Sequence, residues 1–111
     1  RRGCNDPDVT AVDVVGFLGV KTWNKFEEQM LRYVQSSRRL LIDLGYLVGV
    51  DGTGLASLGR VVKEAEQLGV SIQVIRLTPR IADVLSYSAL KQVLGRYIST
   101  SEETAIRRLK D

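Results

Sequence analysis

The sequence predicts one α/β domain, with a mixed, mostly parallel sheet of four to five strands and about four helices mainly on one face. Two observations predict this fold. Short β-branched, apolar runs alternate along the chain with segments whose apolar residues recur at helical spacing. The 111 residues suffice for one core, and no repeat or linker divides them. We therefore expect a flexible N-terminal tail over residues 1–8 and a single domain over residues 9–111.

The first half of the domain is expected to run strand, helix, strand. Residues 9–18 are β-branched and apolar, which indicates one strand or a hairpin. Thr22 can cap a following helix, whose apolar residues between positions 26 and 34 recur at helical spacing. Residues 40–44 form a nearly continuous apolar run, which is typical of a strand buried on both faces.

The middle of the chain contains the clearest helix. A loop over residues 45–52 is expected first. Apolar side chains between residues 55 and 68 then fall on one helical face, and Gly69 follows as a stop signal. Residues 70–75 alternate as a further strand.

Two more helices and a short strand are expected to complete the domain. Thr78 and Pro79 supply an N-cap and a proline at the first helical position. Residues 97–98 indicate a last short strand. Residues 99–102 carry the spacing of a capping box, which predicts that a final helix opens there.

Composition argues against several classes of function. The chain has no histidine, which excludes imidazole metal sites and Ser-His or Cys-His nucleophiles, so we expect no enzyme, metal or cofactor. The single cysteine, Cys4, cannot form an internal disulfide and suits a cytoplasmic protein. Many of the basic residues behind the net charge of +3 fall as separated pairs, not as the contiguous stripe that would bind nucleic acid. Apolar stretches fall far short of the roughly 20 residues that membrane insertion needs.

The most unusual local chemistry lies in the glycine-rich segment between the buried strand and the clearest helix. A phosphate cradle for a nucleotide is one interpretation, but the third glycine, Gly59, comes two residues too late for a dinucleotide fingerprint. A receiver-type phosphoacceptor at Asp43 is another, but it needs a neighbouring acidic pair and a lysine. Asp43 is more simply a strand-end carboxylate that accepts from nearby backbone amides.

The third interpretation makes Thr53 the important residue, as a hydroxyl displayed at the start of a helix. Thr53 could be only the N-cap. A phosphate there would instead meet the positive end of the helix dipole, so the fold would tolerate it. The same phosphate would place nearly two negative charges within a docking surface, where removing their hydration is unfavourable. Phosphorylation could therefore release a partner without unfolding the domain.

Residues 41–44, followed after a short spacer by residues 50–55, resemble the central motif of STAS domains, the family of anti-sigma factor antagonists and their relatives. That motif runs as an apolar strand, Asp-Ser-Ser/Thr-Gly-Leu and an apolar helix. The resemblance extends from about residue 9 to residue 109 and implies a STAS-like fold. It places Thr53 at the regulatory phosphoacceptor position. It also assigns partner binding to five neighbouring residues, which are Asp51, Gly52, Gly54, Leu55 and Ser57.

The resemblance implies a bacterial phosphoprotein of transcription regulation, whose partner is a serine/threonine kinase that also acts as an anti-sigma factor. Two positions depart from the family pattern. Gly52 replaces the first serine of the motif, and Gly19 stands where the family often has an aspartate. The first alternative is a regulatory module docked to a subunit of an anion or lipid transport system. A nucleotide-binding module is the second alternative, and weak homo-oligomer formation is left open.

Overall fold

The computed structural model describes residues 6–111 of the protein, so most of the predicted tail, including Cys4, lies outside the described residues. Five strands and five helices follow one another along the chain. The strands are β1 (Thr10–Asp13), β2 (Gly16–Leu18), β3 (Arg39–Asp43), β4 (Leu47–Val50) and β5 (Ser71–Ile75). The helices are α1 (Trp23–Ser36), α2 (Gly52–Gln67), α3 (Pro79–Ser86), α4 (Lys91–Gly95) and α5 (Glu102–Lys110). The predicted α/β fold class is confirmed.

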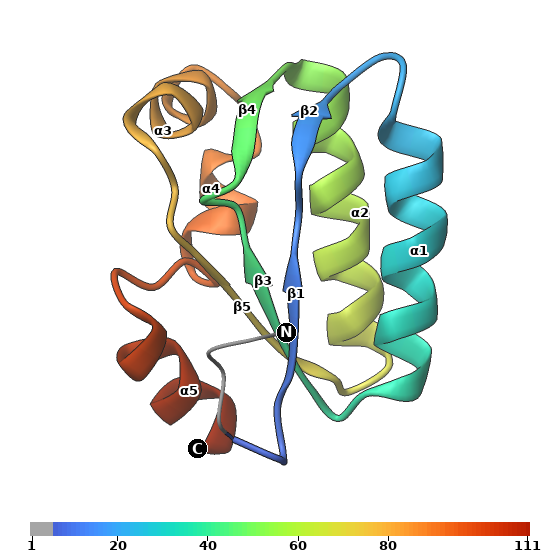
Figure 1. Ribbon diagram of the computed structural model, residues 1–111, viewed down its shortest axis with the longest axis vertical. Helices are drawn as coiled ribbons and strands as arrows, with labels where there is room; N and C mark the ends of the chain where they lie inside the picture. Colours follow the sequence, from blue (N-terminus) through green and yellow to red (C-terminus); the bar gives the residue numbers. More distant parts are fainter. Residues whose placement is uncertain (1–5) are drawn as a thin grey trace.

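Strand pairing is parallel throughout the named strands, but the sheet is divided in two. β1, β3 and β5 form one sheet in the order β1-β3-β5, and β2 pairs with β4 in a second. Figure 1 shows that β1 runs on into β2 and β3 into β4, so the second sheet extends the first. Residues 9–18 therefore contribute two collinear strands and no hairpin. The break coincides with Gly16, whose φ of 92° a side chain would disfavour.

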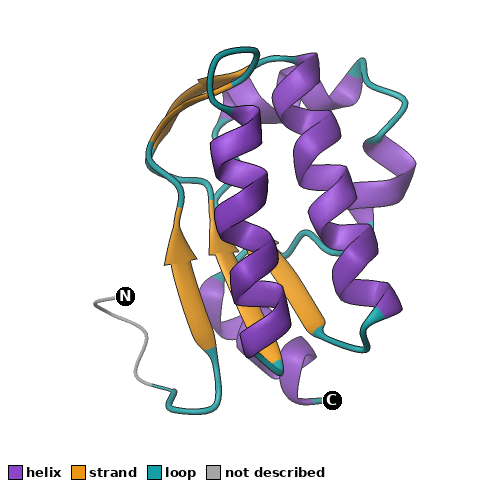
Figure 2. Cartoon of the chain, turned by 90° about the vertical axis from the view of Figure 1, so that its right-hand side faces the viewer, coloured by secondary structure: helices purple, strands orange, loops and turns teal. Residues whose placement is uncertain are grey.

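Apolar side chains on the two faces of β3 divide the core. Leu40 and Ile42 belong to the main core cluster, which includes buried side chains of α1, α2 and α3. Leu41 packs on the other face with residues of α5 such as Ala105 and Leu109. β3 is thus buried on both faces, as its continuous apolar run predicts. Figure 2 shows α1 and α2 side by side in front of the strands.

Three sequence predictions need correction. The expected loop over residues 45–52 contains β4, whose glycine weakened the strand signal. The expected strand at residues 97–98 is only an isolated bridge between Val74 and Ile98. The last helix is capped by Ser101, which accepts from the Thr104 amide, and not by the earlier Ser99. The hydroxyl of Ser99 is instead buried against the Gln73 amide oxygen at 2.5 Å.

Candidate functional site

Asp51, and not Thr53, caps α2. Oδ1 of Asp51 accepts from the Gly54 amide at 2.9 Å, and the Asp51 carbonyl accepts from the Leu55 amide at 3.0 Å. Aspartate is among the preferred N-cap residues because its carboxylate satisfies an amide that the helix leaves free. The cap releases the Thr53 hydroxyl from the structural role that a threonine at a helix start often has.

The same carboxylate ties α2 to the loop between β2 and α1. Oδ2 of Asp51 accepts from the Val20 amide at 3.1 Å, and the Asp51 amide donates to the Leu18 carbonyl at 3.2 Å. Gly19 lies directly against this carboxylate, and a side chain at that position would collide with it. The resemblance predicts an aspartate at this position. Because Gly19 has no side chain, it leaves room for the Asp51 carboxylate.

Thr22 holds the other side of this loop. The Thr22 hydroxyl donates to the Phe17 carbonyl at 2.7 Å and accepts from the Gly19 amide at 3.0 Å. These bonds use the hydroxyl that the sequence predicts as a helix cap, and α1 begins after Thr22 without a side-chain cap bond. Together Asp51 and Thr22 fix the β2–α1 loop beside the start of α2 (Figure 1).

Thr53 lies in the first turn of α2 and is half-buried, beside the exposed Gly52. Across the described residues, the Thr53 hydroxyl makes no hydrogen bond, and neither do the amides of Gly52 and Thr53. A hydroxyl and two free amides therefore lie together at the positive end of a helix of 16 residues.

The other predicted partner-binding residues are buried beneath this surface. Gly54, Leu55 and Ser57 are each buried, so their side chains do not reach a partner directly in this structure. Gly54 abuts the Leu18 carbonyl so closely that a Cβ would collide with it. Direct contact can come only from Asp51, Gly52 and Thr53 among the predicted set, and the buried three hold those residues in place.

Ser57 joins a polar cluster between α1 and α2. Its hydroxyl lies 2.9 Å from Glu27 Oε1 and 3.3 Å from the Trp23 carbonyl. Arg60 Nε donates to the same Glu27 oxygen at 2.7 Å, and the Arg60 guanidinium lies 5.3 Å from the centre of the Trp23 ring. This cluster fixes the two helices to one another one turn beyond Thr53.

Asp43 has the structural role expected of a strand-end carboxylate. It is fully buried, and its Oδ1 accepts from the Gly45 amide at 2.8 Å. Its other oxygen accepts from Arg76, which follows β5 with a φ of 59° and was not predicted as a partner. The hydrogen bond to Asp43, reinforced by its charge, raises the pKa of Arg76 above the ordinary value.

Residues on the β2–α1 loop also belong to this end of the molecule, although the sequence does not single them out. Val20 is exposed and donates to the Asp51 carboxylate, and the neighbouring Lys21 is exposed as well. The sequence offers only one sign of this surface, the apolar Val20 in a loop, and such a residue alone is weak evidence of a binding site. Within residues 6–111 no group of acidic or thiol side chains is arranged to hold a metal ion, and no helix has the length and apolar character needed to cross a membrane.

Comparison with known protein families finds a matching model. The family model described as "Mlab, STAS domain" matches residues 5–96. No match was found among curated protein sequences. Among solved structures, an anti-sigma factor antagonist from Mycobacterium paratuberculosis superposes with a TM-score of 0.80 at 18% identity, over 96% of this chain and 90% of that one.

Two further structures extend the comparison. The Bacillus cell fate determinant SpoIIAA in its phosphorylated form gives a TM-score of 0.66 at 16% identity, over 95% of this chain and 94% of that one. The murine anion transporter Slc26a9 gives 0.78 at 16% identity, over 93% of this chain. The chain spans only 18% of that transporter's length. At these identities the three structures show a shared fold.

Proposed function

Because the chain belongs to the STAS domain family, we propose that it is a protein-docking domain whose partner is released by phosphorylation of Thr53. One observation carries the proposal. The Thr53 hydroxyl makes no hydrogen bond within residues 6–111 and lies beside two free amides in the first turn of α2, because Asp51 supplies the cap. The hydroxyl is therefore available for modification.

A phosphate on Thr53 would act on docking and not on folding. Its charge of nearly −2 would meet the helix dipole and the free amides of Gly52 and Thr53, which favour an anion at that position. A partner seated over Gly52 and Thr53 would have to displace the hydration of that phosphate or place its own groups against it. An uncompensated charge of this kind in an interface typically weakens binding by about 2 kcal/mol or more.

The proposed partner is a kinase. The family resemblance implies a serine/threonine kinase that also acts as an anti-sigma factor. The structures of SpoIIAA, an anti-sigma factor antagonist, in unphosphorylated and phosphorylated forms support a switch by phosphorylation. On this proposal the domain works in the bacterial cytoplasm, regulates transcription by binding and performs no catalysis. The partner would contact Asp51, Gly52 and Thr53 directly, while Gly54, Leu55 and Ser57 support them from below.

A second candidate function is a regulatory module of a transport system. The similarity to part of Slc26a9 favours it, since the matching region is a small fraction of a membrane transporter. Such a module would stay docked to a transporter subunit and would not need Thr53 to be modified. Binding that is indifferent to Thr53→Asp therefore favours this candidate over the phosphorylation switch.

Incubation with a candidate kinase from the same genome and ATP, followed by phosphosite mapping by mass spectrometry, tests the proposal. We expect one phosphate, on Thr53, and none on a Thr53→Val variant. Thr104 provides an internal control, because it also lies in the first turn of a helix but accepts from Ser101. Phosphorylation elsewhere, with Thr53 unmodified, would overturn the proposed switch.

A further inference from the structure

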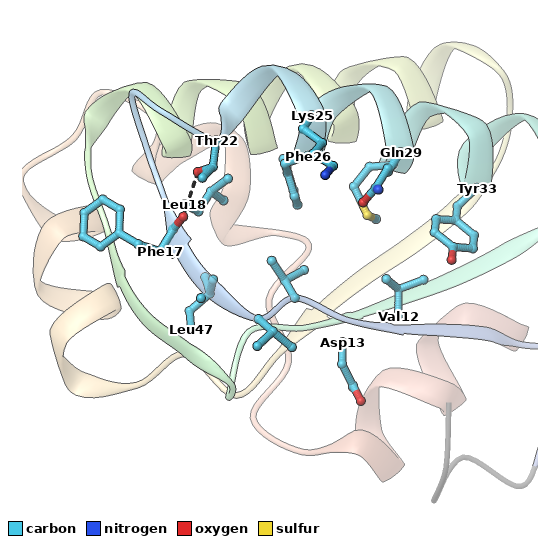
Figure 3. Close-up of a pocket in the computed structure, with 14 residues that line it drawn as sticks. Val12, Asp13, Phe17, Leu18, Thr22, Lys25, Phe26, Gln29, Tyr33 and Leu47 are labelled. Atoms are coloured by element: carbon cyan, nitrogen blue, oxygen red, sulfur yellow. Dashed lines mark hydrogen bonds between the residues drawn. The ribbon is translucent and has the colours of Figure 1, made fainter.

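A groove runs between α1 and the edge strands β1 and β2, away from Thr53. Its volume is about 380 Å³. Figure 3 shows Lys25, Gln29 and Tyr33 projecting from α1 on one side and the β1–β2 backbone on the other. Buried apolar side chains form its floor, namely Val14, Leu18, Phe26, Met30 and Leu47. We call this feature the edge groove.

The strand side of the edge groove is a free sheet edge. β1 pairs only with β3, and β2 only with β4, so neither has a neighbour on its outer side within the described residues. The Val14 amide donates to the Asp43 carbonyl of β3. Val15 follows in the link between β1 and β2, where the alternation of backbone amides predicts that its amide points outward. This amide has no backbone partner among the described residues.

This edge has only part of the usual protection against strand addition: β1 and β2 are short, and the exposed Asp13 is their one charged residue. Proteins commonly place lysine, proline or inward charges along a free edge to prevent pairing. Here Val15 is 75% exposed and Phe17 is 50% exposed. A bulge interrupts the pairing of β2 with β4 at one place, between Gly16 and Phe17. Phe17 itself lies across Gly49, where an added Cβ would come within 2.8 Å of its ring. Exposed apolar residues on this edge, beside a groove, favour a surface that another chain covers.

The helix side of the edge groove specifies the charge of that chain. Lys25, Gln29 and Tyr33 follow at intervals of four and form one row along α1. All three are exposed, and Lys25 has no ion pair among residues 6–111. Asp13, on the strand side of the groove, points away from α1 (Figure 3). A partner's carboxylate beside α1 would therefore pair with Lys25.

We propose that the edge groove binds an extended segment of a partner protein, which adds as a strand to β1–β2 and directs apolar side chains and one carboxylate toward α1. Main-chain hydrogen bonds to the free edge would provide affinity, and the groove and Lys25 would select alternate side chains. This site is separate from Thr53 and does not require Thr53 to be modified. The inference can therefore stand or fail independently of the phosphorylation switch.

Titration of the ¹⁵N-labelled domain with the peptide acetyl-Thr-Val-Thr-Glu-Thr-Val-Thr-amide tests the inference. We expect saturable shifts confined to residues 11–18 and 25–33, with a dissociation constant on the order of 1 mM or tighter. Exchange of the Val15 amide should slow by about tenfold at saturation, while that of Val14, already bonded to Asp43, should change little. No saturable change, or shifts centred outside these residues, would overturn the proposal.

Two controls separate strand addition from unspecific apolar contact. One peptide carries N-methyl groups on the amides that would face β1–β2, and a second carries them on the amides that would face away. Only the first peptide should fail to bind. Lys25→Glu should weaken binding about tenfold, and replacing the peptide glutamate by lysine should restore it. The matched variant Lys63→Glu, exposed on α2, should bind like wild type. Equal loss with both N-methylated peptides, or no restoration by the charge exchange, would contradict strand addition with a carboxylate at Lys25.

Discussion

At the scale of single residues, the start of α2 separates a structural task from a chemical one. Asp51 satisfies the Gly54 amide and ties down Val20, so it maintains the fold. The hydroxyl of Thr53, two residues later, makes no hydrogen bond in the described part of the chain. The sequence predicts a cap near this point, but both residue types are good caps, and only the geometry shows which one serves.

Replacing Asp51 by alanine should lower the free energy of unfolding by about 2 kcal/mol, because two amides lose their acceptor. Urea unfolding followed by circular dichroism measures the change. Thr53→Ala is the matched control and should stay within about 0.5 kcal/mol of wild type. A similar loss for both variants would show that Thr53 also has a structural role.

Gly54 and Gly52 form a second matched pair. A methyl group at Gly54 meets the Leu18 carbonyl, whereas one at Gly52 meets nothing within 4 Å. We expect Gly54→Ala to reduce the free energy of unfolding by about 1–3 kcal/mol through overpacking. Gly52→Ala, at the first helical position, should leave stability unchanged or slightly raise it. Equal melting temperatures for the two variants would contradict the close approach of α2 to β2.

At the scale of elements, the sequence predicts those parts whose pattern is local. The apolar stripe of α2, the double-sided burial of β3 and the Thr78 cap of α3 all follow from spacing within one segment. The sequence does not predict β4, because Gly49 interrupts its apolar run. The Asp43–Arg76 pair also escapes it, because β3 and β5 bring together residues that are 33 positions apart.

The cluster between α1 and α2 allows a prediction at this scale. Ser57→Ala removes a buried hydroxyl next to Glu27 and should cost about 1 kcal/mol of stability. The double variant with Glu27→Ala should lose less than the two single losses together, because the groups contact one another. Arg32→Ala breaks an exposed pair with Glu28 on the same helix and should have almost no effect. Strict additivity would contradict the cluster.

At the scale of the whole molecule, α5 covers the face of the sheet opposite α1 and α2, and its last turn contacts Asp6 and Asp8. Lys110 Nζ lies 2.5 Å from Asp6 Oδ2 and 4.0 Å from Asp8 Oδ2. The last part of the predicted tail is therefore tied to α5. Composition gave no sign of this contact, because it joins the two ends of the chain.

This contact predicts a pH dependence of stability. The hydrogen bond from Lys110, aided by the Asp8 amide, lowers the pKa of Asp6 below its ordinary value of 3.8. As pH falls, the Asp6 carboxylate is therefore protonated in the unfolded chain before it is protonated in the folded chain. Its contribution to stability is present above pH 3.8 and is lost as pH falls through the lower pKa of the folded state. Asp6→Asn should flatten the acid limb of the urea stability profile. Asp83→Asn, at an exposed position, should not.

The proposed switch depends most on one consequence of the free Thr53 hydroxyl. The decisive measurement is the dissociation constant of the purified partner for the domain with phosphothreonine at position 53, compared with the unmodified domain. We predict binding at least about 30-fold weaker, equivalent to roughly 2 kcal/mol, with an unchanged circular dichroism spectrum and melting temperature. Equal affinities for the two forms, or loss of binding that accompanies unfolding, would contradict a docking surface switched at Thr53.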